Sequence, residues 1–179
     1  MMRLMGLDLD GVLYEWHTSV YDYCVRFRDY TKSITEFWTN PYESCDMDFW
    51  NTITEVDIFY SNMSPTPDCV KFLDVVKEKF ELYYITSRPD YVKTTTQQYL
   101  RRYGFPYQDN LIFTKDKVNM ARKLQLSYII LDNVENVKSL SNVTNTILRA
   151  RPWNKEIWDL YPTCHSLMDA LQFIDLEDS

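Results

Sequence analysis

The sequence predicts an α/β protein in which a Rossmann-like parallel sheet is flanked by helices, with a small helical cap inserted after the first strand. Two observations support this prediction. Short apolar runs alternate with amphipathic segments between residues 69 and 174, a pattern that favours parallel strands joined by right-handed crossovers. Residues 16–66, in contrast, carry aromatic and polar residues at helical spacing without a convincing strand. We therefore expect a core of residues 1–15 and 67–179 and a cap of residues 16–66.

The strands are predicted from short apolar runs bounded by turn residues. The first run, 3–9, is apolar enough for a strand buried on both faces. Each later run follows an amphipathic segment, as in a repeated strand-helix unit. The expected strands are 3–9, 81–87, 110–114, 127–133 and 145–150.

The helices are predicted from apolar residues that recur every three or four positions. In the segment 19–30, Val20, Cys24 and Phe27 share one side, and Gly104 marks the end of another helix. The stretch "SPTPD" at 64–68 closes the cap, and the turn at Asn40-Pro41 precedes one or two further cap helices. The other expected helices are 69–80, 90–104, 115–126, 134–141 and 164–174.

Composition limits the class of protein. With 179 residues, 45% of them apolar, the chain is long enough for a core domain with one elaboration. The formal charge of −7 argues against a nucleic acid polymer as partner, because binding to its backbone requires a basic face. A small anionic substrate held by a few local cations remains compatible with this charge.

The cysteines and the chain start favour a cytoplasmic protein. The four cysteines form no C-x-x-C pair, and with only two histidines they argue against zinc. The acidic pair that begins at Asp8 leaves no room for a targeting segment. No apolar run approaches the ~20 residues that a membrane span requires. We expect a reduced, cytoplasmic protein, either a monomer or a homodimer, without a membrane partner.

Polar and charged residues follow four of the predicted strands directly. Ligands of open parallel sheets bind beyond the carboxyl ends of the strands, so these residues should gather at one edge. Carboxylates, hydroxyls and lysines together suit a divalent cation, a phosphate and a nucleophile. The residues are Asp8 and Asp10, Thr86 to Pro89, Thr114 to Lys117, and Asp132 with Asn133.

Phosphate ester hydrolysis would explain why two carboxylates stand side by side. Two ionised acids repel each other and are costly to bury unless a cation or a reaction requires them. Asp8 and Asp132 could supply the one or two carboxylates that Mg²⁺ prefers. Asp10 could act as general acid and then base. A hydroxyl of Thr86 or Ser87 and the ammonium of Lys117 could hold the phosphate oxygens. A lone D-x-D-G sequence is usually a solvated turn. A calcium loop is excluded by the spacing of its glycine and its final residue.

Four motifs together resemble the haloacid dehalogenase (HAD) superfamily of aspartate-nucleophile phosphatases. They are "GLDLDGVLY", "YYITSRP", "TKDK" and "IILDN", in the order of that family. The approach "DIFYSNMSPTPDCVKFLDVV" is similar to the 5′(3′)-deoxyribonucleotidase branch. The insertion between the first two motifs lies where the family places its first type of cap.

The resemblance implies a role for each motif residue. Asp8 would be the nucleophile, and Asp10 the acid/base whose main-chain carbonyl binds the metal. Thr86 would bind phosphate, Lys117 would be the lysine of the third motif, and Asp132 a metal ligand. Lys117 is preferred to Lys115 because it begins the following helix. Asn133 departs from the branch, where many members carry a second Asp, and could bind the metal only through its amide oxygen or a water.

Other residues near these motifs have two interpretations. Among the cap aromatics, Trp16, Phe49 and Trp50 are candidate substrate contacts, although for any one of them packing of a small helical layer is the favoured explanation. His17 is interpreted as a cap hinge rather than a substrate contact. Arg88 either binds phosphate or pairs with a nearby acid. The segment 149–154, "RARPWN", has no predicted role beyond local packing.

The sequence thus predicts a Mg²⁺-dependent phosphatase that acts through an aspartyl-phosphate intermediate, with nucleoside monophosphates as substrates. The alternatives are a HAD phosphatase for another small phosphate ester or for a nucleic acid 3′-phosphate end, and a nucleotide-binding protein without turnover. The base, the sugar and the position of the ester are left open.

Overall fold

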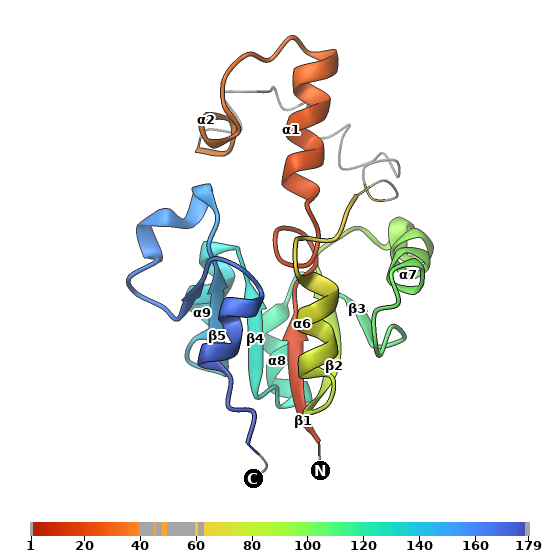
Figure 1. The fold of residues 1–179 in the computed structure, drawn as a ribbon, viewed down its shortest axis with the longest axis vertical. Helices are drawn as coiled ribbons and strands as arrows, with labels where there is room; N and C mark the ends of the chain where they lie inside the picture. Colours follow the sequence, from red (N-terminus) through yellow and green to blue (C-terminus); the bar gives the residue numbers. More distant parts are fainter. Residues whose placement is uncertain (1, 40–44, 46–47, 50–59, 61–62, 178–179) are drawn as a thin grey trace.

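The core is one six-stranded sheet in which every strand runs parallel to its neighbours (Figure 1). This computed structural model describes residues 2–39, 45, 48–49, 60 and 63–177. The strand order is β3-β2-β1-β4-β5-β6, so the predicted Rossmann-like fold class is confirmed. The strands are β1 (Arg3–Leu7), β2 (Phe80–Thr86), β3 (Leu111–Phe113), β4 (Tyr128–Leu131), β5 (Asn145–Arg149) and β6 (Thr163–Cys164).

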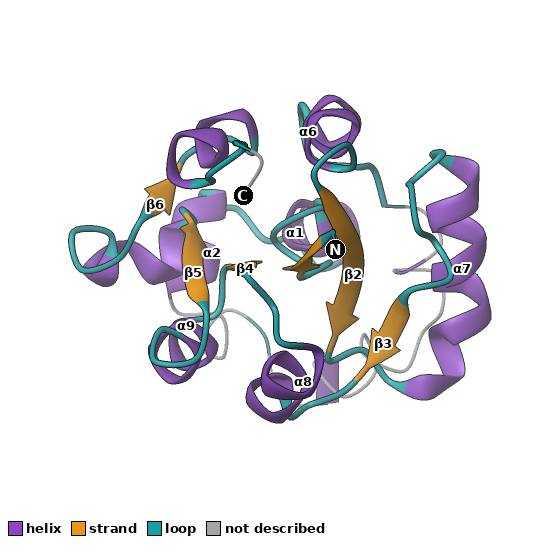
Figure 2. Cartoon of the chain, turned by 90° about the horizontal axis from the view of Figure 1, so that it is seen from below, coloured by secondary structure: helices purple, strands orange, loops and turns teal. Residues whose placement is uncertain are grey.

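Helices cover both faces of the sheet, as the view in Figure 2 shows. One face packs against α6 (Cys69–Val76), α7 (Lys93–Arg102) and the 3₁₀ helix η3 (Met168–Phe173). The other face packs against α8 (Lys117–Leu124) and α9 (Val134–Leu140). A further 3₁₀ turn, η1 (Asp90–Val92), precedes α7. This double covering explains why the central strands are apolar on both sides.

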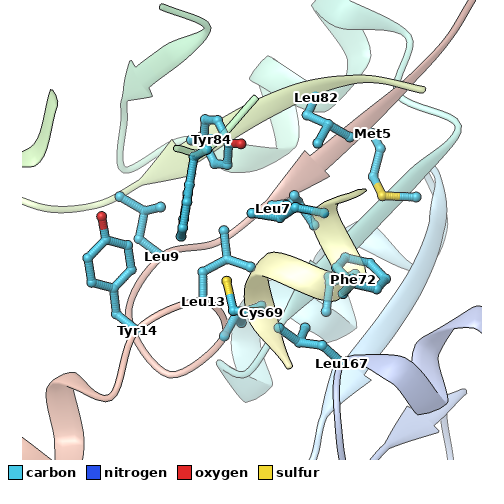
Figure 3. Close-up of a cluster of buried hydrophobic side chains, with 14 of the residues drawn as sticks. Met5, Leu7, Leu9, Leu13, Tyr14, Cys69, Phe72, Leu82, Tyr84 and Leu167 are labelled. Atoms are coloured by element: carbon cyan, nitrogen blue, oxygen red, sulfur yellow. The ribbon is translucent and has the colours of Figure 1, made fainter. Parts of the chain in front are cut away.

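Each face of the sheet has an apolar core, and the larger one surrounds the end of β1 and the turn that follows it. Figure 3 shows Leu7 of β1 beside Leu13 of this turn and Phe72 of α6. The turn folds back tightly, because the N–H groups of Leu13 and Tyr14 both donate to the carbonyl of Leu9, each at 2.9 Å. This apolar packing anchors the turn that carries the two acids of the first motif.

The end of the chain differs from the prediction. The helix predicted over 164–174 is replaced by β6 followed by η3, and another 3₁₀ helix, η2 (Pro152–Ile157), lies before them. Cys164 pairs with Arg149 of β5 and is fully buried, so sheet pairing overrides the helical periodicity at this position. The predicted first strand, 3–9, ends at Leu7 because the chain turns back on Leu9.

Two helices from the predicted cap lie beyond the carboxyl ends of the strands, α1 (Trp16–Phe27) and α2 (Ile34–Thr39) (Figure 1). They share an apolar cluster of their own, which includes Val20, Phe37 and Trp38. Most of the stretch 40–60, where further cap helices are predicted, falls outside the described residues. Among the helices that the structure describes, none has the length and apolar character to cross a membrane.

Candidate active site

The site lies at the switch point of the sheet, where the order of the strands reverses between β1 and β4. β2 and β3 extend the sheet on one side of β1, and β4 to β6 extend it on the other. Open α/β sheets bind ligands at the carboxyl end of such a switch point. Asp8 follows β1, Asp132 follows β4, and the N–H of Asp8 donates to the carbonyl of Ile130 at 3.1 Å. A cavity of about 850 Å³ opens at this edge and is lined by both acids.

Asp8 is held at the floor of the cavity by two fixed donors. Its side chain forms a buried ion pair with the ammonium of Lys117, and its Oδ1 accepts a hydrogen bond from the N–H of Leu9 at 2.8 Å. Burial raises the pKa of the Asp8 carboxyl, while the charge of Lys117 opposes that shift. Lys117 is the first residue of α8, and Asp116 caps that helix by accepting from the N–H of Asn119 at 2.9 Å.

Asp132 lies against the same turn from the neighbouring strand. Gly11 has a φ of +78°, and a Cβ built there would lie 2.7 Å from Cγ of Asp132 and 2.8 Å from Cε1 of His17. Burial, and then the charge of Asp8, raise the pKa of Asp132 to about 7. The structure therefore brings the predicted acids Asp8 and Asp132 together around one point.

Asp10 is bound by Arg88 through both carboxylate oxygens. Nε of Arg88 donates to Oδ2 at 2.8 Å, and NH2 donates to Oδ1 at 2.6 Å. NH1 of the same guanidinium donates to Oγ1 of Thr96 at 3.0 Å, and the group lies over the ring of Tyr14. Of the two interpretations of Arg88, pairing with an acid matches the structure. A two-pronged contact of this kind fixes the orientation of the carboxylate.

The hydroxyl residues and Lys115 line the cavity beside these acids. Thr86 is buried at the end of β2, and its Oγ1 accepts from the N–H of Arg88 at 3.2 Å. Ser87 is exposed, and its Oγ donates to the carbonyl of Thr114 at 3.3 Å. Lys115 faces the cavity as well, but Lys117 is the lysine that contacts Asp8.

Asn133 also lines the cavity, but its side chain has a local function. Its Oδ1 accepts from the N–H of Asn136 at 3.0 Å and thereby caps α9. An Asp at this position could cap the helix in the same way. Helix capping is therefore sufficient to explain an Asn or Asp at position 133, and no metal needs to be invoked for it.

The arrangement of acids fits a hard divalent cation. Among the described residues, no three His, Cys, Asp or Glu side chains converge as a metal-binding group. Mg²⁺ needs only one or two carboxylates, because waters and substrate phosphate complete its six ligands. The charges of Lys117 and Arg151 act against the two carboxylates of Asp8 and Asp132, while Arg88 pairs with Asp10. Burial is the largest cause of the raised pKa of Asp132 and the charge of Asp8 is the second, and a bound cation would favour the ionised carboxylate against both.

Aromatic rings form one wall of the cavity. The ring of Trp153 lies 3.9 Å from that of His17 and 5.5 Å from that of Trp38, measured between centroids. Trp16, a candidate substrate contact in the sequence, also lines the cavity. Phe49 differs from that expectation: it is buried among the cap aromatics, with its ring 6.3 Å from that of Tyr23, and is not among the cavity-lining residues. Trp50, predicted with it, lies outside the described residues.

His17, interpreted from the sequence as a cap hinge rather than a substrate contact, lies at the start of α1. Its carbonyl accepts from Nε1 of Trp38 at 3.2 Å, which ties the start of α1 to α2. Its ring lines the cavity. Burial lowers the pKa of His17 well below its usual range, and the nearby charge of Arg151 acts in the same direction. The ring is therefore neutral at physiological pH and offers an aromatic surface rather than a charge.

One part of the site, formed by residues 151–154, was not predicted from the sequence. Trp153 lines the cavity, and Nε of Arg151 donates to the carbonyl of Gly11 at 2.7 Å. The signal was available, because this segment follows β5 at the same edge of the sheet as the other motifs. Ligands of open parallel sheets bind beyond the carboxyl ends of the strands, so extending this expectation to β5 would have included residues 151–154.

Comparisons with known proteins place the chain in a family. Residues 2–177 match the model of the family described as 5′ nucleotidase, deoxy (pyrimidine), cytosolic type C protein. A Bacillus cereus protein provisionally named as a nucleotidase is 31% identical over 88 residues, which are 46% of this chain and 46% of that protein.

Solved structures show the same fold. A haloacid dehalogenase-like hydrolase from Streptococcus pneumoniae has a TM-score of 0.67 at 12% identity, covering 97% of this chain and 99% of its own. A HAD family hydrolase from Deinococcus radiodurans, solved with bound phosphate and sodium, has a TM-score of 0.57 at 13% identity, covering 86% of this chain and 82% of its own.

Proposed function

Because the chain belongs to the family of 5′ nucleotidase, deoxy (pyrimidine), cytosolic type C proteins, we propose that it hydrolyses the phosphate ester of nucleoside monophosphates. The single observation that carries this proposal is the buried Asp8 carboxylate, held by Lys117 beside Asp132 at the floor of a cavity with an aromatic wall. In the proposed substrate, the phosphate would bind at the floor of the cavity and the planar base would contact its aromatic wall.

In the proposed reaction Asp8 is the nucleophile. Its carboxylate attacks phosphorus, the bond to the ester oxygen breaks, and Asp10, in its protonated form, gives its proton to that leaving oxygen. Asp10 then takes a proton from a water that attacks the aspartyl phosphate, which releases phosphate and restores Asp8. Arg88 supports the step in which Asp10 acts as base, because its two hydrogen bonds keep the ionised Asp10 carboxylate in one orientation.

The phosphate oxygens would be bound by Lys117 and by the hydroxyls of Thr86 and Ser87, which all line the cavity. Lys117 offers the positive charge, and its place at the start of α8 sets it beside Asp8. The phosphate is anionic and repels an attacking carboxylate, so its negative charge must be offset by a cation before the attack.

Mg²⁺ is the cofactor that the donor set fits. We propose that Asp8, Asp132 and the main-chain carbonyl of Asp10 hold it. When bound, it supplies charge that screens the attacking carboxylate from the phosphate oxygens. Asn133, which caps α9, lies near enough to the cavity to contact a water of such an ion.

The leaving group would lie beneath the cap formed by residues 16–66. Trp16, His17 and Trp38 come from the described part of this cap and reach the cavity, and Trp153 of the core completes the same wall. Aromatic side chains that line a cavity suit stacking on a flat, uncharged group. This wall favours a nucleobase over a small aliphatic leaving group.

The test is phosphate release from a panel of ribo- and deoxyribonucleoside monophosphates, small phosphate esters and a 3′-phosphorylated oligonucleotide, with and without Mg²⁺. We expect Mg²⁺-dependent release that is fastest with mononucleotides and abolished in Asp8→Asn, since an amide cannot form the acyl phosphate. Undiminished release by Asp8→Asn would refute the mechanism, and faster release from the oligonucleotide or a small ester would refute the substrate class. Nucleotide binding without release would indicate a binding protein.

A further inference from the structure

One buried amide lies at the centre of the loop that follows β5. The side chain of Asn154, in η2, is fully buried. Its Nδ2 donates to the carbonyl of Asp132 at 2.7 Å and to that of Arg149 at 2.9 Å. Its Oδ1 accepts from the N–H of Arg151 at 2.9 Å and from Nε1 of Trp158 at 2.7 Å.

These four bonds use the whole hydrogen-bonding capacity of a primary amide, two donated and two accepted. Both partners of the nitrogen are carbonyls and both partners of the oxygen are N–H groups, so only one orientation of the amide satisfies them. An Asp in this place would set an acceptor against two carbonyls, and an apolar residue would leave four buried groups unpaired. The chemistry of the pocket therefore selects Asn.

The carbonyl that Asn154 binds belongs to Asp132, one residue beyond the end of β4. Beyond this point the chain leaves the sheet and starts α9 at Val134, so strand pairing does not hold it. The hydrogen bond from Asn154 therefore fixes the main chain from which the Asp132 carboxylate extends towards the turn at Gly11.

The same loop also contacts the turn after β1, which carries the other acid, Asp8. Arg151 donates from Nε to the carbonyl of Gly11, and its NH2 lies 3.5 Å from Oε1 of Glu15. Gly11 follows Asp10 directly in the turn that carries Asp8. The loop thus connects the ends of β1 and β4, which are adjacent in the sheet but distant in sequence.

We propose that Asn154 is a positioning residue for the cation site: by fixing the main chain of Asp132 relative to the β1 turn, it sets the affinity for the divalent cation. The inference rests on the proposed function, because it takes Asp8 and Asp132 as the cation ligands. Outer partners that orient the ligands of a metal typically contribute about 10- to 100-fold to its affinity. We expect an effect of at least about tenfold from the loss of Asn154.

The experiment measures Mn²⁺ binding to the full chain by electron paramagnetic resonance, which reports free Mn²⁺ and does not depend on turnover. The variant is Asn154→Leu, similar in volume but without hydrogen bonds. The matched control is Trp158→Phe, which removes one bond to Oδ1 and leaves the donation to Asp132 intact. Asp132→Asn is the reference for loss of a ligand, and Asn154→Ser replaces Asn154→Leu if the latter does not fold.

The expected result is Mn²⁺ binding at least about tenfold weaker in the Asn154 variant and close to wild type in Trp158→Phe. Unchanged binding in a folded Asn154 variant would overturn the inference, as would equal weakening in both variants, which indicates a general structural effect. Wild-type protein that binds no Mn²⁺, or binds it regardless of Asp132, would overturn it too. Wild-type protein that binds Mn²⁺ through Asp132 but releases no phosphate would refute the proposed function alone.

Discussion

Replacing Gly11 by Ala tests the closeness of the two acids directly. The added Cβ would lie 2.7 Å from Cγ of Asp132 and 2.8 Å from Cε1 of His17, about 0.7 Å or more inside ordinary contact. The Asp132 carboxylate must move away by a distance of that order. Misplacing a reacting group by about 1 Å costs roughly 100-fold in rate, or about 2.7 kcal/mol of transition-state stabilisation.

The backbone adds a second, separable cost. Gly11 has a φ of +78°, and the left-handed region costs a residue with a Cβ about 1–2 kcal/mol. Gly104 provides the matched control, because its φ is +66° and a Cβ there meets nothing within 4 Å. Gly104→Ala therefore carries the backbone cost without the collision.

The assay combines steady-state phosphate release at saturating Mg²⁺ with urea unfolding of each variant. We expect both variants to lose about 1–2 kcal/mol of unfolding free energy, but only Gly11→Ala to lose roughly 100-fold in kcat/KM. If Gly11→Ala stayed within about threefold of Gly104→Ala in kcat/KM, a difference below ~0.7 kcal/mol, the inferred proximity of Asp132 to the β1 turn would be wrong.

Four further predictions concern single groups of the site. Arg88→Met should lower kcat by about 10- to 100-fold with little change in KM, because Asp10 loses its two fixed hydrogen bonds; a rise in KM with constant kcat would instead make Arg88 a substrate ligand. Trp153→Ala should raise KM for nucleoside monophosphates by roughly 2- to 10-fold, the worth of about 0.5–1.5 kcal/mol of stacking, and leave KM for glycerol phosphate unchanged; an equal rise for both would refute the stacking role. The pKa of Asp132, raised to about 7 without a cation, makes Mn²⁺ displace a proton, so binding should weaken up to about tenfold per pH unit below 7. For the same group, the metal-free protein should lose stability as pH rises from about 4 to 7, because the folded state keeps the proton that the unfolded state releases. Mn²⁺ titrations between pH 5 and 8 and thermal unfolding between pH 4 and 8 measure the two effects, and pH-independent binding would contradict the raised pKa.

The sequence by itself predicted the parallel sheet and the acids at its edge, and the physical reason is that both signals are local. Strand and helix periodicity depends on neighbouring residues, and the polar residues of each motif directly follow an apolar strand. Parallel strands then bring their carboxyl ends together without any further information. Asp8 and Asp132 could therefore be placed at one edge before their contacts were known.

The tertiary structure decided the partners of those acids. Asp10 and Arg88 are 78 residues apart, and Arg151 and Gly11 are 140 apart, so no sequence period relates them. The last strand and Asn154 were missed for the same reason, since pairing with β5 and burial against Asp132 define them. Helical spacing can identify an apolar face, but packing in three dimensions determines which aromatic ring joins the core and which lines the cavity.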